Sequence, residues 1–372
     1  MPPTPSPQGA GPPTADRLRL LDGGAEAYPA MLAAIGAARE AVLLEVYHFA
    51  LDGVGQTFAE ALAAAARRGV RVRVLLDGWG SAAEAGALGR RLAAAGAALE
   101  VFNPMRLAAL GRLRRNHRKV LAVDEEVAFV GSLNLCEEHL PRGRDGAPAW
   151  ADLSLEIRGP TAAWLQRHAT PWRGGRLLRG RAPAGPVRVW LSGLGGGRRL
   201  RRRYLKAIGG ASRRVLLAHA YFLPDRHLVR TITAAARRGV QIRLLLPAHS
   251  DVGLTRLAAR GLYRRLLAAG VEIREWPRSV LHVKVAAVDG HRLLLGSFNL
   301  DPLSLVNLEV LAEVEAPEVV ADGERWIEAR LAEAKPILAG RSPDTWLSRW
   351  WEELLGRDAA RLMRLVSWLL QR

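Results

Sequence analysis

The sequence predicts an α/β protein of two tandem βαβ lobes, with mostly parallel sheets packed around a pseudo-twofold axis and a C-terminal amphipathic helical segment. Segments of the first half recur in the second half in the same order. Each half also alternates apolar strands with an alanine-rich helix, the pattern typical of βαβ units. With 372 residues, 49% of them hydrophobic, the chain is long enough to form two cores.

The repeated elements are visible when residues 42–49 are placed beside residues 215–222. Each of these apolar strands precedes an alanine-rich helix, which ends at Gly69 in the first half and at Gly239 in the second. Another strand follows each helix. Because a repeat of this length is a duplicated domain rather than a solenoid unit, we expect two similar lobes.

Composition sets the expected domain boundaries. Residues 1–15 are rich in proline and glycine and carry no charge, which predicts a disordered tail. A stretch rich in glycine and arginine, residues 173–186, is expected to link the lobes. The two lobes then span residues 16–172 and 187–316, and the C-terminal helical segment spans residues 317–372.

The charge balance predicts an anionic partner. The chain carries 54 lysines and arginines against 36 acidic residues, a formal net charge of +18 at pH 7. Either a nucleic acid or a membrane surface would suit this charge, and composition alone does not separate them. The single cysteine, Cys136, excludes an internal disulfide and gives no sign of a catalytic thiol.

Two segments favour the membrane surface. Residues 105–115 and the tryptophan-rich residues 346–372 both mix arginines with bulky apolar side chains. For the first segment, an amphipathic helix packed on the core is an equal alternative. The sequence has no run of about 18 uncharged apolar residues, and residues 1–15 lack the order of a secretory signal. We therefore expect peripheral attachment to the cytoplasmic face of the cell membrane.

The most informative motif is H-x-K-x-x-x-x-D, which occurs twice. Because a strand sends alternate side chains to one face, the histidine and lysine of each copy share a side. The aspartate belongs to the motif and is a candidate catalytic residue, but its place after an apolar run favours a structural or supporting role. The six residues are His117, Lys119, Asp124, His282, Lys284 and Asp289.

A second signature, G-S-x-N, follows each copy of the first at the same distance. Its polar side chains are Ser132, Asn134, Ser297 and Asn299. Matched pairs of this kind indicate that the two halves carry equivalent parts of one site.

These paired signatures resemble the phospholipase D superfamily over most of residues 17–315. Within it, the chain is most similar to bacterial cardiolipin synthases of the cardiolipin synthase B type, which share residues 18–46, residues 75–81 and the basic segment before the first motif. Such synthases also have the pattern N-x-D-x-R-S-x-x-x-N-x-E. The chain departs from this pattern at Leu303, which replaces the arginine, and by one residue fewer after Ser304; with that shorter spacing its residue types fit the pattern at Asn299, Asp301, Ser304, Asn307 and Glu309.

The resemblance implies that the two histidines converge on one phosphodiester. Phosphodiesters resist attack and need a proton on the leaving group, so one neutral imidazole can attack phosphorus while a second, protonated imidazole supplies the proton. By resemblance, His117 is the expected nucleophile and His282 the expected acid and base. The reverse order stays open, because both histidines have matching sequence surroundings.

The other motif residues have expected supporting roles. The lysines and asparagines suit the non-bridging phosphate oxygens, where fixed donors stabilise developing charge, and the serines either add to these contacts or shape a turn. Asp152 and Glu309 are expected to accept the far ring N–H of a histidine. In relatives this pairing crosses between the halves, so Asp152 would serve His282. His48 and His219, at nearly equivalent strand ends, are further candidates to face the cleft.

The resulting expectation is a phosphatidyltransferase that makes cardiolipin from anionic phospholipid, from two phosphatidylglycerols with release of glycerol. No metal or cofactor is expected, because a lysine interrupts each histidine motif and there is no cysteine cluster. A hydrolytic phospholipase D, a phosphodiesterase acting on nucleic acid, and a binding module without chemistry are the alternatives. Nucleic acid is the less expected partner, and the sequence does not indicate an oligomeric state.

Overall fold

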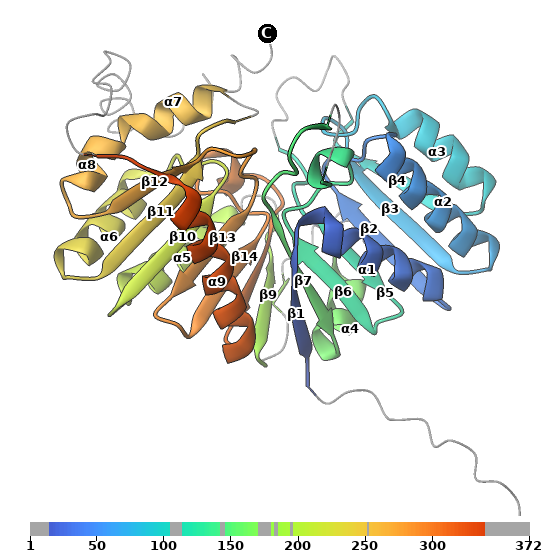
Figure 1. The fold of residues 1–372 in the computed structure, drawn as a ribbon. Helices are drawn as coiled ribbons and strands as arrows, with labels where there is room; N and C mark the ends of the chain where they lie inside the picture. The colour runs from blue at the N-terminus through green and yellow to red at the C-terminus, as the bar shows by residue number, and fades with distance from the viewer. Residues whose placement is uncertain are drawn as a thin grey trace, which may run out of the picture.

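Two α/β lobes stand side by side in the computed structural model, each built on one sheet with helices against it (Figure 1). The structure describes residues 15–104, 114–141, 146–169, 180–181, 185–193, 196–250 and 253–338. The expected tail (1–15, apart from residue 15), most of the expected linker, residues 105–113 and the tryptophan-rich residues 346–372 therefore lie outside the described residues.

The first lobe holds a seven-stranded sheet in the order β1-β7-β6-β5-β2-β3-β4. Its elements are β1 (Arg17–Asp22), α1 (Gly23–Ala37), β2 (Ala41–Val46), α2 (Gly53–Arg67), β3 (Arg71–Asp77), α3 (Ala85–Ala94), β4 (Ala98–Phe102), β5 (Val120–Val123), β6 (Val127–Gly131), the 3₁₀ turn η2 (Glu137–His139), β7 (Leu153–Arg158) and α4 (Pro160–His168).

The second lobe holds a nine-stranded sheet in the order β16-β12-β11-β10-β13-β14-β15-β9-β8. Its elements are β8 (Gly180–Arg181), β9 (Val187–Leu191), α5 (Gly197–Gly209), β10 (Arg214–His219), α6 (Arg226–Arg237), β11 (Gln241–Pro247), α7 (Gly253–Gly261), α8 (Tyr263–Leu267), β12 (Glu272–Trp276), β13 (Lys284–Val288), β14 (Arg292–Gly296), the 3₁₀ turn η4 (Leu303–Leu305), β15 (Val310–Val314), α9 (Pro317–Glu333) and β16 (Lys335–Pro336). Apart from β8 and β16, its strand order repeats that of the first sheet.

Both lobes have the expected α/β class and tandem arrangement, but their sheets are mixed rather than mostly parallel. Only the β2–β3, β3–β4, β10–β11 and β11–β12 pairs run parallel, and the other pairs of named strands are antiparallel. The reason is local. A short turn joins β5 to β6 and another joins β13 to β14, and a short turn can connect only antiparallel neighbours.

Three large hydrophobic clusters make up most of the core of the described residues. One cluster lies between the first sheet and helices α1–α3, and another between the second sheet and helices α5, α6 and α8. The third cluster joins the lobes, because it contains residues of both sheets together with α4 and α9. In β5, Val120 and Ala122 belong to the shared cluster whereas Leu121 and Val123 face the outer helices, so this strand is covered on both faces.

Helix α9 belongs to the second lobe, although the sequence analysis placed residues 317–372 in a membrane-surface segment. It buries Val320, Ile327 and Leu331 in the shared cluster. Each buried aliphatic side chain is worth about 1.5–3 kcal/mol, which is sufficient to hold the helix on the protein. Trp326 Nε1 also donates to Asp22 Oδ1 of the first lobe at 2.7 Å. Among the described residues, none of the helices combines the length and apolar character that crossing a bilayer requires.

Candidate active site

The two motif histidines lie just before β5 and β13, where the two lobes are in contact. The backbone N–H of His117 donates to the carbonyl oxygen of Leu308, and that of His282 donates to Ala151, both at 2.9 Å. The segments around Leu308 and Ala151 return hydrogen bonds to the opposite strand start and form isolated parallel bridges with it. Each histidine is therefore positioned by backbone from the other lobe.

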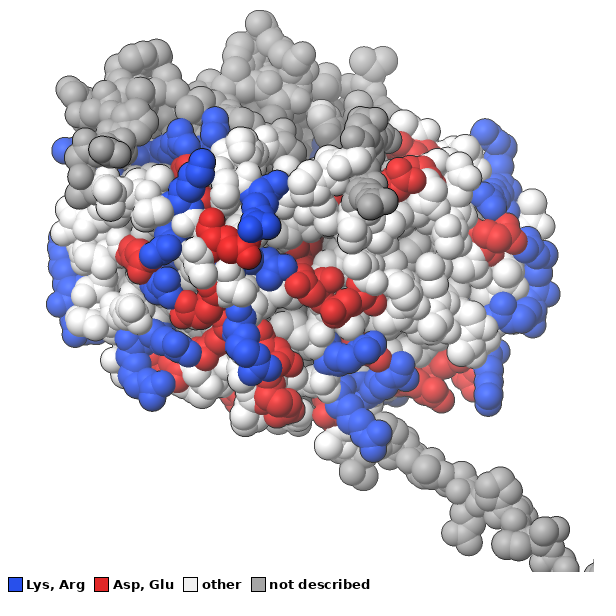
Figure 2. Space-filling view, in the orientation of Figure 1, with Lys and Arg blue, Asp and Glu red and all other residues white. Residues whose placement is uncertain are grey.

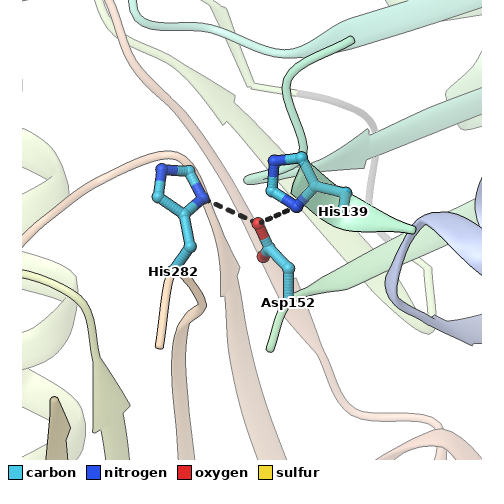
Figure 3. A group of neighbouring side chains, drawn as sticks. All are labelled: His139, Asp152 and His282. Carbon is cyan, nitrogen blue, oxygen red and sulfur yellow. Dashed lines mark hydrogen bonds and ion pairs between the residues drawn. The ribbon is translucent and has the colours of Figure 1, made fainter. Parts of the chain in front are cut away.

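The residue after each bridging residue carries a buried carboxylate. His282 Nδ1 lies 2.7 Å from Asp152 Oδ2, and His117 Nδ1 lies 3.0 Å from Glu309 Oε2. Both acids are completely buried. The structure thus pairs each histidine with the acid of the other lobe, and Figure 3 shows the Asp152–His282 pair. Because Nδ1 faces an acid in both rings, Nε2 is the nitrogen left for chemistry.

Both motif lysines are buried beside the histidines. Lys119 Nζ donates to the carbonyl oxygen of His117 at 3.0 Å, and Lys284 Nζ lies 3.2 Å from His282 Nε2. Burial, and then repulsion from Lys284, lowers the pKa of Lys119 well below its ordinary value. The two lysines repel each other across the lobes, so an anion placed between them would relieve this repulsion.

Burial also lowers the pKa values of the two imidazoles. It lowers the pKa of His117, an effect that Glu309 opposes and Lys119 reinforces. It lowers the pKa of His282 far more, with further repulsion from Lys284 and Lys119. Both rings are therefore neutral in the unliganded site near pH 7, and a bound phosphate anion would favour protonation of one of them.

The serines of the second signature hold the acids. Ser132 Oγ donates to Asp152, and Ser297 Oγ donates to Glu309 while accepting the N–H of Val310 at 3.0 Å. Of the two roles that the sequence left open, these contacts match the structural one.

The asparagines of the same signature are open to a ligand. Asn134 and Asn299 are nearly buried, and within the described part of the chain the side-chain oxygen of each has no hydrogen-bond partner. A buried acceptor without a partner is costly, so each of these oxygens is suited to accept a hydrogen bond from a hydroxyl group of a bound molecule.

The structure does not bring Asp124 and Asp289 into the site, contrary to their listing among the candidate catalytic residues. A strand separates each aspartate from its motif lysine, and five residues of strand span about 16 Å. Both residues have φ 53°. Their carboxylates bind the backbone of the segment that leads into a neighbouring strand. Asp124 accepts N–H groups of Arg39, Glu40 and Ala41, and Asp289 accepts those of Ser212, Arg213 and Arg214.

The remaining histidine candidates have local partners. His48 Nδ1 lies 2.6 Å from the carbonyl oxygen of Gly80. His219 is completely buried at the end of β10, and its ring meets that of Tyr204 edge-on with centroids 5.6 Å apart. The His48 contact is not with a reacting group, whereas His219 is the cross-strand neighbour of the motif lysine Lys284 in the β10–β13 pair.

Sequence reasoning missed His139. This residue is buried, and its Nδ1 lies 3.6 Å from Asp152 Oδ2, on the other side of that carboxylate from His282 (Figure 3). Its spacing from Asn134, which equals the spacing of Ser304 from Asn299, was the available signal. These three side chains, His139, Asp152 and His282, are also of the types that bind metal ions and have ligand atoms within 4.8 Å of one another.

Known proteins resemble this chain in sequence and fold. A family model described as cardiolipin synthase, PLD-like domain, matches residues 31–145 and 204–331. The chain is 37% identical over 312 residues to cardiolipin synthase B of Shigella flexneri, covering 79% of this chain and 75% of that protein. It is 34% identical over 316 residues to a cardiolipin synthase of Geobacillus kaustophilus, covering 80% of this chain and 62% of that protein.

A solved structure shares the whole fold. The phosphatidylserine synthase of Haemophilus influenzae matches with a TM-score of 0.69 and 13% identity, over 95% of this chain and 94% of that one. Together, these similarities confirm the family resemblance that the paired signatures indicate.

Proposed function

Because the chain belongs to the cardiolipin synthase family of phospholipase D-like enzymes, we propose that it joins two phosphatidylglycerol molecules into cardiolipin and releases glycerol. As a member of this family it is a phosphatidyltransferase. The observation that carries the specific proposal is the crossed pair of acid–histidine contacts, which supplies two imidazoles from opposite lobes with their Nδ1 atoms already held.

In the first step, His117 Nε2 attacks the phosphorus of one phosphatidylglycerol. A P–N bond forms, the P–O bond to glycerol breaks, and His282 gives its proton to the departing glycerol oxygen. Glu309 stabilises the Nδ1 proton of His117 as the ring becomes positively charged. The product of this step is a phosphatidyl group on His117.

In the second step, neutral His282 takes the proton of a glycerol hydroxyl on the second phosphatidylglycerol. That oxygen attacks phosphorus, the P–N bond breaks, and cardiolipin is released with His282 protonated again. Lys119, Lys284 and the two signature asparagines stabilise the charge on the non-bridging oxygens in both steps. Water in place of the second lipid would give hydrolysis instead.

The proposed place of action is a membrane surface, to which the chain attaches peripherally. The substrate is anionic and lipid-borne, and the net charge of +18 favours an anionic surface. Figure 2 shows basic and acidic side chains interspersed on the visible face, so the positive charge there is not gathered into a groove of the kind that nucleic acid needs.

The test is product analysis with the full chain. Vesicles of phosphatidylglycerol labelled in the headgroup glycerol are incubated with the enzyme in the presence of EDTA, and lipids and free glycerol are separated. We expect one glycerol released for each cardiolipin formed. Phosphatidic acid alone would replace the proposal by hydrolysis, and nicking of plasmid DNA without lipid products would replace it by a nuclease.

Variants test the two histidines. His117→Ala and His282→Ala should each abolish cardiolipin formation, whereas His291→Ala, at an exposed turn between β13 and β14, is the matched control and should not. Quenching in SDS at mildly alkaline pH, with the p-nitrophenyl ester of phosphatidic acid labelled in the phosphorus, should trap a phosphoenzyme in His282→Ala and none in His117→Ala, because the P–N bond survives at this pH and the phenolate leaves without a proton. The opposite trapping pattern would exchange the two roles.

A further inference from the structure

The pseudo-twofold symmetry of the site is broken at one position beside the reacting groups. In the second lobe, the backbone N–H of Asn299 donates to Ser304 Oγ at 3.1 Å. In the first lobe, the backbone N–H of Asn134 donates to His139 Nε2 at 3.3 Å. His139 therefore stands where the other lobe has a serine, and it performs the same hydrogen bond with a much larger side chain.

Because histidine is longer than serine, the ring of His139 extends to Asp152. Because Nε2 accepts the N–H of Asn134, the ring proton resides on Nδ1. That Nδ1 lies 3.6 Å from Asp152 Oδ2, the same oxygen that His282 Nδ1 contacts at 2.7 Å. The carboxylate thus lies between two imidazoles, as Figure 3 shows. The His139 and His282 rings also meet edge-on, with centroids 5.4 Å apart.

The other acid lacks such a neighbour. Glu309 Oε2 serves both His117 and Ser297, while its Oε1 is buried without a hydrogen-bond partner among the described residues. Asp152 accepts from Ser132 and, at 2.8 Å, from the backbone N–H of Leu153 on Oδ1, and from His282 Nδ1 on Oδ2, with His139 Nδ1 a further 3.6 Å from Oδ2 and without a hydrogen bond to it among the described residues. The two acids therefore differ in how many donors surround them.

This difference has a chemical consequence. A carboxylate surrounded by donors pulls less on the proton of its histidine, so a protonated His282 releases its Nε2 proton more readily. A carboxylate with fewer donors polarises its histidine more strongly, which makes His117 Nε2 the better nucleophile.

We propose that His139 is a positioning residue whose Nδ1–H, 3.6 Å from Asp152 Oδ2, stabilises that carboxylate electrostatically and thereby fits His282 for proton transfer, leaving His117 as the nucleophile. The proposal rests on the proposed function, because it assigns the proton donor of that reaction. His139 itself touches no reacting atom and acts only through Asp152.

The surroundings of His139 keep its ring neutral, with the proton on Nδ1. Burial lowers its pKa to about 3, with Asp152 opposing the shift and His282, Lys284 and Lys119 adding to it. The ring therefore stays neutral over the pH range in which the enzyme would work. A metal ion on the same three side chains is disfavoured, because it would displace the Nδ1 proton, deprive Asn134 of its acceptor and face Lys284.

The experiment compares His139→Ser with the unaltered enzyme on two substrates. Serine copies the residue of the second lobe and keeps an acceptor for Asn134, but it does not reach Asp152. One substrate is phosphatidylglycerol, whose glycerol needs a proton to leave. The other is the p-nitrophenyl ester of phosphatidic acid, whose phenolate leaves without one, so the burst of nitrophenolate in the first turnover bypasses the proton donor.

We expect His139→Ser to lower kcat for cardiolipin formation by about 10- to 100-fold, the usual effect of losing an outer partner of a functional histidine. The nitrophenolate burst should stay close to that of the unaltered enzyme. His139→Gln, whose amide offers both an acceptor and a donor, should recover part of the loss. Thermal unfolding of each variant establishes that it is folded.

Three outcomes would overturn the proposal. His139→Ser could slow both substrates equally, which indicates a structural role, or slow neither. Cardiolipin formation by the unaltered enzyme could also require a metal ion that EDTA removes, which would assign the three side chains to that ion. If the unaltered enzyme makes no cardiolipin but gives the burst, the proposed function fails, and glycerol released from phosphatidylglycerol by hydrolysis, compared with the burst, then shows whether His139→Ser acts on proton transfer.

Discussion

At the scale of single residues, the site brings charged and titratable groups together in a buried place. Two lysines, two carboxylates and two imidazoles converge where water is nearly excluded, since His117 retains 13% side-chain exposure and His282 5%. Buried charges interact strongly because they are poorly screened. The site is therefore suited to a phosphate group, whose charge opposes the mutual repulsion of Lys119 and Lys284.

His219 gives a residue-scale prediction about pH. Burial, followed by repulsion from Lys284, lowers its pKa to about 3. Between about pH 6.5 and pH 3 the unfolded chain binds a proton at this histidine and the folded chain does not, so stability falls as the pH falls through this window. Valine, the residue at the corresponding end of β2, removes this proton uptake in His219→Val.

The expected result is a flatter pH dependence. From pH 6 to pH 4 the unaltered protein should lose about 1.4 kcal/mol per pH unit more than His219→Val, because all other titrating groups are common to both. Urea unfolding at a series of pH values measures the two slopes. Parallel slopes would contradict the assigned protonation of His219, whatever the absolute stability of the variant.

At the scale of elements, strand length decides which motif residues meet the substrate. The histidine and lysine stand at the start of β5 or β13, and the strand then carries the aspartate to the opposite edge of the sheet. There the aspartate fixes the turn before the neighbouring strand β2 or β10. The motif thus joins two functions, chemistry at one strand end and folding at the other.

A substitution of Asp289 tests whether the motif aspartate acts in folding rather than in chemistry. Partial burial raises its pKa, but the N–H groups of Ser212, Arg214 and Arg213 outweigh burial and bring it down to about 2. This carboxylate therefore stabilises the fold above about pH 3.8, and its contribution is lost as the pH falls through 2. We expect Asp289→Asn to destabilise the protein by about 1 kcal/mol at pH 7, as loss of a cap does, with kcat per folded molecule unchanged.

Thermal unfolding and activity measured at a temperature where the variant is folded separate these effects. A large loss of kcat in folded Asp289→Asn would return this residue to the catalytic set. Asp124→Asn is the matched variant in the first lobe and should behave in the same way.

At the scale of the whole molecule, the site exists only between the lobes. The shared core, helices α4 and α9, and the reciprocal bridges at Asn116–Leu308 and Ala151–Leu281 hold the two sheets together. Buried Arg118 adds to this, with its Nη2 donating to the carbonyl oxygen of Ser192 across the lobes at 2.7 Å. A relative rotation of the lobes would separate each histidine from its acid.

A mixing experiment tests whether one chain completes the site. Because His117 and His282 reach the same site from two lobes of one molecule, a mixture of His117→Ala and His282→Ala should stay as inactive as either variant alone. Cardiolipin formation is measured after mixing the folded proteins and again after they are unfolded and refolded together. Activity regained on simple mixing would place the site between two chains.

Much of this protein can be predicted from its sequence, because duplication and local periodicity are written in neighbouring residues. The two lobes, the strands covered on both faces, the family and the motif residues all follow from patterns a few residues long. The structural role of the aspartates was also favoured, since turn chemistry is local. The mixed sheets do not follow from the βαβ pattern, because the antiparallel pairs β5–β6 and β13–β14 are joined by short turns outside that pattern.

Only the tertiary structure decided how close each acid lies to its histidine and which side chain lies on the far side of Asp152. Asp152 and His282 are 130 residues apart, and they meet because backbone bridges join the two lobes at the strand starts. His139 showed no chemistry in the sequence, because its importance depends on a carboxylate that long-range packing brings to its ring. Local sequence specifies which groups are available, but the distances between them arise from contacts between segments that no local pattern relates.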